Sequence, residues 1–195
     1  ICNRRCEDAC TRGTVDSPVA IDEIKKFIAE QELHEDKRFI PVCEKDDGGM
    51  WGSDYKMAVI GAGPAGMTCA YYLRTRGYDV TVFEKEKRPG GMLLNGIPNF
   101  RLQKDVLEAE IEVLRQMGVE FKCGTEVGHD VTIQELRDQG YKAFYLSIGL
   151  QGGRKAGVPG EDAEGVESGV SFLKRASLGL SSDGTSDDVK LPGDV

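Results

Sequence analysis

The feature that most constrains this chain is a glycine-rich turn between a predicted strand and a predicted helix. Residues 57–60 form a short apolar run, typical of a strand buried on both faces of a parallel sheet. The segment Gly61-Ala62-Gly63-Pro64-Ala65-Gly66 follows at once, and a helix is predicted over 64–76. A second apolar run over 79–83 ends at Glu84. Strand, helix and strand in this order predict a βαβ unit.

Each glycine of this turn has a separate mechanical role. Gly61 permits the tight turn, Gly63 lets a pyrophosphate approach the backbone, and Gly66 lets the helix pack close to the sheet. Free backbone N–H groups and the positive end of the helix dipole then face the phosphates. Glu84 is placed to accept hydrogen bonds from an adenosine ribose and to repel a 2′-phosphate. These residues predict a dinucleotide site that refuses NADP.

Further along the chain, helices and strands continue to alternate. We expect a Rossmann-like α/β fold, in which helices cover a parallel sheet, preceded by a short N-terminal helical segment. The remaining predicted elements are a helix over 102–117, a strand over 119–122, a helix over 132–138, a strand over 141–148 and a helix over 169–176. Ahead of the sheet, helical spacing of apolar residues predicts a helix over 17–31, with Ser17 as its cap and Pro18 in its first turn.

These elements divide the chain into three predicted parts. Residues 1–50 are a helical segment with a linker, 51–180 are the Rossmann-like domain, and 181–195 are a loosely ordered acidic tail. The chain begins at Ile1 within a group of cysteines, so we expect it to be a fragment of a longer protein.

Composition excludes several classes of partner. The formal net charge is −8 and the pI is about 4.9. The chain lacks the net positive charge typical of proteins that bind a phosphate backbone, so nucleic acid is not expected as a partner. We find neither a secretory leader nor an apolar stretch that could span a membrane. Six cysteines in a chain of ordinary globular composition predict thiols in a reducing, cytoplasmic compartment.

Three of the cysteines, Cys2, Cys6 and Cys10, lie close together in the sequence. Soft sulfur ligands at this spacing suit an iron–sulfur cluster or zinc, but three ligands do not close a four-ligand site. Free thiols on a disordered segment are the alternative interpretation. The other cysteines, at positions 43, 69 and 123, are expected to be packed thiols.

Taken together, these motifs resemble the small subunit of NADPH-dependent glutamate synthase and its relatives, including the flavin half of dihydropyrimidine dehydrogenase. The resemblance covers nearly the whole chain. The segments that carry it are the three N-terminal cysteines, residues 18–21, 59–66, 89–93, 96–98, 100–102, 147–149 and 157–160. Gln103 departs from the proline common in the family.

The resemblance implies that the glycine turn and Glu84 bind FAD. It further implies a cofactor contact at Lys85, Gly90, Gly91, Met92, Leu93 and Arg101, with Val127 beside the adenine and Gly149 near the pyrophosphate. The three cysteines are similar to ligands of two [4Fe–4S] clusters whose other cysteines lie upstream. Lys25 occupies the position of a carboxylate or amide ligand, and a protonated lysine cannot coordinate iron.

The function implied is that of an enzyme, an NAD(P)H-dependent flavin oxidoreductase. Electrons would pass from NADPH through FAD to Fe–S clusters and to a redox partner such as the glutamate synthase large subunit, with no side chain acting as acid, base or nucleophile. No second glycine fingerprint is present, so NADPH is expected at a missing domain and the fragment alone is expected to be inactive. The alternatives are a flavin subunit serving ferredoxin, hydrogenase or formate dehydrogenase, and a nonredox adenine-nucleotide-binding regulatory module.

Overall fold

The computed structural model describes residues 2–35, 38–42 and 55–179. The chain forms two compact units, Ile1–Ile40 and Pro41–Val195. The domain boundary predicted near residue 50 and the acidic tail over 181–195 lie outside the described residues. In the part of the chain that is described, no helix is long and apolar enough to cross a membrane.

The second unit is built on a four-stranded sheet in which every pairing is parallel, with strand order β3-β2-β1-β4. Ile60 at the end of β1 pairs with Phe83 on β2 and with Leu146 on β4, so the strands end at one edge of the sheet. This confirms the predicted α/β fold. The strands are β1 (Lys56–Ile60), β2 (Asp79–Glu84), β3 (Glu120–Cys123) and β4 (Tyr141–Leu146).

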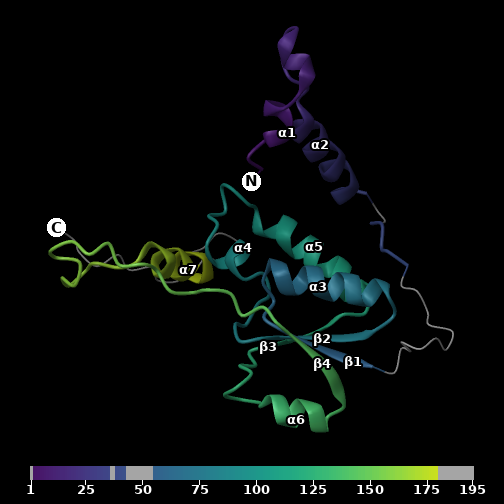
Figure 1. Cartoon of the computed structure of the whole chain (residues 1–195), viewed down its shortest axis with the longest axis vertical. Coiled ribbons are helices and arrows are strands. Elements are labelled where there is room, and N and C mark those ends of the chain that lie inside the picture. The colour runs from purple at the N-terminus through teal and green to yellow at the C-terminus, as the bar shows by residue number, and fades with distance from the viewer. Residues whose placement is uncertain (1, 36–37, 43–54, 180–195) are drawn as a thin grey trace. The chain divides into compact units, whose positions relative to one another are not determined.

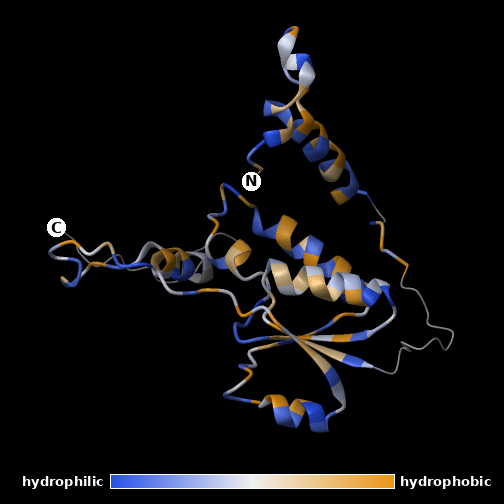
Figure 2. Ribbon diagram, viewed as in Figure 1, coloured by the Kyte–Doolittle hydropathy of each residue, from blue (hydrophilic) through white to orange (hydrophobic). Residues whose placement is uncertain are grey.

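Helices cover both faces of this sheet (Figure 1). The longer helices α3 (Pro64–Thr75) and α5 (Lys104–Gln116) lie over one face and the short α6 (Ile133–Asp138) over the other. On α5 and α6, hydrophobic residues alternate with charged ones (Figure 2), as expected of helices with one buried side. The core therefore has two layers, centred on the fully buried side chains of Ile111 and Leu136.

Two further helices, one predicted from the sequence and one not, pack against each other. The segment after Gly90 and Gly91, where no helix is predicted from the sequence, forms the short helix α4 (Met92–Asn95), whose Leu94 is buried in the core. The helix predicted over 169–176 extends to Gly179 as α7 (Gly169–Gly179) and packs on α4. Lys174 on α7 donates to Glu86 at 2.6 Å, which links this helix to the loop after β2.

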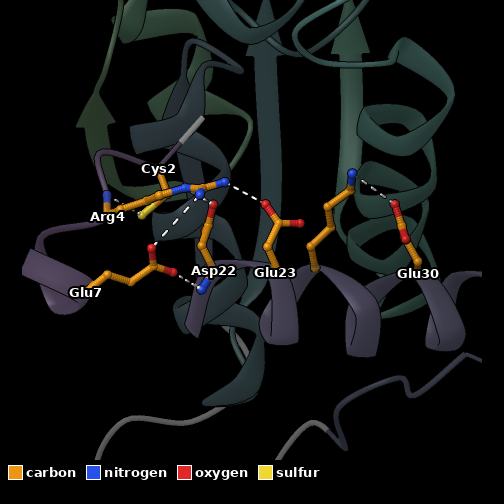
Figure 3. Close-up of polar contacts among 7 residues, drawn as sticks. Cys2, Arg4, Glu7, Asp22, Glu23 and Glu30 are labelled. Carbon is orange, nitrogen blue, oxygen red and sulfur yellow. Dashed lines mark hydrogen bonds and ion pairs between the residues drawn. The ribbon is translucent and has the colours of Figure 1, made fainter. Parts of the chain in front are cut away.

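The first unit contains α1 (Arg5–Asp8), the 3₁₀ turn η1 (Thr11–Thr14) and α2 (Ile21–Leu33). The predicted start of the long helix at Ser17 and Pro18 is wrong, because the regular helix begins at Ile21. A side chain from α1 supplies the cap instead: the backbone N–H of Asp22 donates to Glu7 Oε1 at 2.8 Å (Figure 3). Free N–H groups at the start of a helix can donate to an acceptor that comes from any part of the chain.

Arg4 joins these helices through charge. Its side chain lies between Glu7, Asp22 and Glu23, with the shortest contact, 2.6 Å, to Glu23 Oε1 (Figure 3). Arg4 also has a positive φ of 54°, a conformation uncommon outside glycine, at the residue before α1. Arg4 therefore combines this uncommon backbone conformation with ionic contacts of its side chain to three carboxylates. These two links, Glu7 and Arg4, hold α1 against the start of α2.

The N-terminus of α3 lies against the end of β1 with no room for a side chain between them. A Cβ atom built on Gly66 would lie 1.9 Å from the carbonyl oxygen of Gly61 and 2.7 Å from Ser147 Oγ. By contrast, a Cβ atom built on Gly63 meets nothing within 4 Å. The predicted close packing at Gly66 is therefore present, and it is specific to that glycine.

We expect Gly66→Ala to lower the free energy of unfolding by at least about 2 kcal/mol, because the backbone atoms that the methyl group meets cannot rotate away. Gly63→Ala is the matched control, and its expected change is within about 0.5 kcal/mol. Urea denaturation followed by circular dichroism measures both. Equal stability of the two variants would contradict the close packing at Gly66.

Candidate functional site

The turn after β1 is stabilised by the end of β4. Gly61 has φ of 105°, and a Cβ atom there would lie 2.4 Å from the carbonyl oxygen of Ser147. The Ser147 side chain donates to the carbonyl oxygens of Ile60 at 3.1 Å and Gly61 at 3.0 Å, and its backbone N–H donates to Ile60 at 2.8 Å. Ser147 thus fixes the turn that presents the N-terminus of α3.

Glu84 lies at the end of β2 with only 7% of its surface exposed. Its Oε2 accepts the backbone N–H of Ala62 at 2.7 Å, and its Oε1 accepts that of Glu86 at 2.9 Å. A carboxylate oxygen can accept more than one hydrogen bond, so both oxygens keep capacity for a ligand hydroxyl. The carboxylate therefore binds the glycine turn and still lines the cavity described below.

The loop that contains Gly90 and Gly91 contacts the turn that contains Gly61 and Gly63. Gly90 donates its N–H to the carbonyl oxygen of Ala62 at 2.9 Å, and a Cβ atom on Gly91 would lie 2.7 Å from the α-carbon of Gly63. Gly90 and Gly91 have φ of 132° and 52°. The structure therefore places Gly90 and Gly91 directly against the fingerprint turn.

Beyond Gly91, a lysine holds the chain in place. The Lys104 ammonium, at the start of α5, donates to the carbonyl oxygens of Leu93 at 2.8 Å and Ile97 at 2.5 Å. Burial lowers the pKa of this ammonium from its usual range. Leu93 lies within α4 and Ile97 lies just after its end, so the ammonium is near the C-terminus of this helix, where a cation is favourable to the helix dipole.

A cavity of about 370 Å³ opens where these segments meet, at the carboxyl ends of the parallel strands. This is the edge at which open α/β sheets bind ligands. Ten of the predicted cofactor-binding residues line it: Gly61, Gly63, Pro64, Ala65, Glu84, Lys85, Gly91, Met92, Val127 and Gly149. The open space beside the Gly63 α-carbon and the N-terminus of α3 together fit a diphosphate.

The other five predicted contact residues lie outside the cavity wall. Ala62 and Gly66 are buried behind the turn, and Gly90 supports it from the second loop. Leu93 packs against the core, and Arg101 is exposed in the turn that follows α4. These residues position the wall or lie beyond it in this structure, and a ligand contact for any of them stays a prediction.

Several lining residues carried no individual prediction: Phe83, Glu86, Asn95, Thr125, Glu126 and Gln151. Thr125 reaches the cavity because its backbone N–H donates to the carbonyl oxygen of Glu84 at 2.9 Å, which extends the pairing of β2 with β3. Its place just after a parallel strand is the signal by which the sequence could have identified it. For Asn95 the sequence offers no such signal, since α4 is not apparent from it.

The three N-terminal cysteines do not form a metal site in this structure. Cys2 and Cys6 are exposed and Cys10 is half-buried. Within the residues described, no group of three or more His, Cys, Asp or Glu side chains is arranged to hold a metal ion. Backbone N–H groups of Val19, Arg12 and Gly13 lower the pKa of the Cys10 thiol. Cluster ligation by these cysteines stays a prediction, one that requires further ligands.

Comparison with known proteins agrees with this geometry. A family model described as an NAD(P)-binding Rossmann-like domain matches residues 59–105, the stretch from β1 to the start of α5. Among solved structures, FprA from Mycobacterium tuberculosis in complex with NADPH is similar in fold, with a TM-score of 0.56 and 24% identity. The likeness covers 62% of this chain and 28% of that one, and it concerns the fold alone.

Three oxidoreductase subunits are similar over about nine-tenths of this chain. The NADP(+)-dependent formate dehydrogenase subunit beta of Moorella thermoacetica is 40% identical and covers 91% of the chain. The dihydropyrimidine dehydrogenase subunit PreT and the NADPH glutamate synthase small chain, both of Escherichia coli, are 40% and 37% identical and each cover 88%. The match spans 27%, 39% and 35% of these relatives. The chain is therefore a homologue of these NAD(P)H-dependent oxidoreductase subunits, the glutamate synthase small chain among them, and it spans about a third of their length.

Proposed function

We propose that this chain binds FAD and is the flavin-binding part of an NADPH-dependent oxidoreductase similar to the glutamate synthase small chain. The observation that carries the proposal is the continuous cavity, whose wall includes Glu84 and Val127, the open side of Gly63, and Met92 on α4. A wall that continues past the diphosphate position suits a dinucleotide better than a mononucleotide. The similarity to three oxidoreductase subunits supports the redox role.

Each part of the wall has a task in holding the cofactor. The N-terminus of α3 and the open α-carbon of Gly63 receive the diphosphate, Glu84 accepts hydrogen bonds from the adenosine ribose, and Val127 lies beside the adenine. Ser147 donates to the carbonyl oxygen of Gly61 in the fingerprint turn, and Lys104 donates to that of Leu93 just after Gly90 and Gly91. These two side chains hold the loops of the cavity wall in place. FAD, when bound, supplies the hydride and electron transfer that no side chain provides.

The reductant and the acceptor belong to a longer protein in this proposal. The sequence holds a single Gly-x-Gly-x-x-Gly fingerprint, so we assign NADPH to a second nucleotide unit of that protein. Transfer to [4Fe–4S] clusters would need ligands beyond Cys2, Cys6 and Cys10. The five described cysteines are free thiols, which is compatible with the cytoplasmic compartment that we propose.

One comparison favours a second candidate for the partner that accepts the electrons. The formate dehydrogenase subunit beta matches this chain at 40% identity, against 37% for the glutamate synthase small chain. A formate dehydrogenase module is therefore an alternative to the large glutamate synthase subunit as redox partner. Subunits that co-purify with the complete protein, identified by mass spectrometry, distinguish the two. A nonredox adenine-nucleotide module remains the alternative of another class, and visible flavin absorbance excludes it.

We expect the purified chain to bind FAD and to show flavin absorbance in the visible range. Gly63→Ala places a methyl group where the diphosphate lies, so its dissociation constant for FAD should rise at least about tenfold. Titration calorimetry measures the affinity. Gly169→Ala, at another glycine with open space around it but outside the cavity, serves as the control. Wild-type affinity in Gly63→Ala would refute the assigned phosphate position.

The ribose assignment predicts a preference between two small ligands. The Glu84 carboxylate should favour AMP over adenosine 2′,5′-diphosphate, which differs from AMP only by its 2′-phosphate, by at least about tenfold, because that phosphate meets a like charge. Glu84→Gln removes that charge and should reduce the ratio of the two affinities. Any general weakening of the turn affects both ligands equally, so the ratio isolates the ribose contact. An unchanged ratio would show that Glu84 does not face the ribose.

A further inference from the structure

Asn95, the last residue of α4, has a buried amide oxygen without a partner. The residue is 4% exposed and belongs to the cavity wall. Its backbone N–H donates to the carbonyl oxygen of Gly91 at 2.9 Å, while its side-chain Oδ1 has no hydrogen bond. Among the side chains that the structure describes, this is the one buried polar atom left unsatisfied. Such an atom destabilises the folded state unless a ligand or water satisfies it.

The position of Asn95 is fixed from both sides, so its side chain cannot move out to solvent with the backbone. Leu94 before it is 2% exposed in the core. After it, the backbone N–H of Gly96 donates to the carbonyl oxygen of Met92 at 2.9 Å. The Lys104 ammonium holds the carbonyl groups of Leu93 and Ile97 on either side. A polar group held this firmly at a cavity wall is preorganised for a ligand atom.

The residue before Asn95 and the residue at the predicted adenine position pack on opposite faces of the sheet. Leu94 packs in the cluster on the α5 face, together with Leu107. Val127 packs against the other cluster, which contains Phe83 and Leu136. Gly91, the residue before α4, lies directly against Gly63. A ligand with its adenosine at Val127 and its diphosphate at Gly63 therefore brings its second half toward α4.

We infer that Asn95 is a specificity-determining residue that recognises the hydroxylated chain following the diphosphate of the cofactor. Asn95 Oδ1 accepts a hydrogen bond from a hydroxyl of that chain, which in FAD is the ribityl group. ADP ends at the diphosphate and offers no such donor. This inference rests on the proposed function, and it adds a contact that separates the complete dinucleotide from its adenosine half.

The test compares FAD with ADP on the purified chain carrying Asn95→Leu. Leucine is similar in size and has no polar atom, so FAD should bind about tenfold more weakly and ADP with unchanged affinity. The ligand-free variant should unfold at the wild-type temperature or a few degrees higher, because a buried unsatisfied oxygen has been removed. Gln116→Leu, which also replaces an amide side chain by leucine but at an exposed position on α5, is the control.

The outcomes separate this inference from the proposed function. Selective loss of FAD affinity together with retained stability supports the role of Asn95. Unchanged FAD affinity overturns it while leaving FAD binding by the chain intact. An equal loss for FAD and ADP also overturns it, because the exchange would then act on the adenosine half or on the fold. A wild-type chain that binds ADP and not FAD refutes the proposed function, and the inference with it.

Discussion

The contact between the carbonyl oxygen of Gly61 and the α-carbon of Gly66 underlies both the fold and the site. It brings the first turn of α3 against the end of β1, so the helix can cover the sheet and bury Met67 and Ala70. The same contact directs the free N–H groups of that turn to the edge where the parallel strands end. Packing and ligand recognition therefore both depend on a glycine, which has no side chain, at position 66.

Around this contact, the cavity is built from loops that are tied together by main-chain hydrogen bonds. Gly90 bonds to Ala62, and Thr125 bonds to Glu84 across the ends of neighbouring strands. Glu84 connects the two groups, because its carboxylate accepts the N–H of Ala62 and its backbone accepts that of Thr125. Such a wall is formed before any ligand arrives, which lowers the entropic cost of ordering it on binding.

The first unit shows how a small helical segment is stabilised by polar contacts. None of its described residues is buried, so Glu7 and Arg4 provide its specific links. Apolar side chains on α2 remain exposed, among them Ile24, Phe27 and Ile28. The donors to the Cys10 sulfur come from η1 and from the segment before α2, so even this thiol's pKa depends on the local fold.

The sequence by itself determined the elements whose signals are local. The glycine fingerprint, the apolar strands and the helical period of α5 predict the βαβ unit and the parallel sheet, because backbone freedom and burial follow residue type. They also identify Glu84, whose distance from the turn follows from the length of one helix and one strand. Helices α3 and α6 begin and end within one residue of their predicted ranges, and α5 within two.

Tertiary structure decided the features that depend on partners distant in sequence. The start of α2 at Ile21 is set by Glu7, and the helix α4 is set by Leu94 in the core and by Lys104 beyond it. Gly91 packs against Gly63 of the fingerprint turn. Asn95 and Thr125 also line the cavity at this edge of the sheet. A side chain that satisfies a helix end or a carbonyl can come from any part of the chain, so no local pattern reveals it.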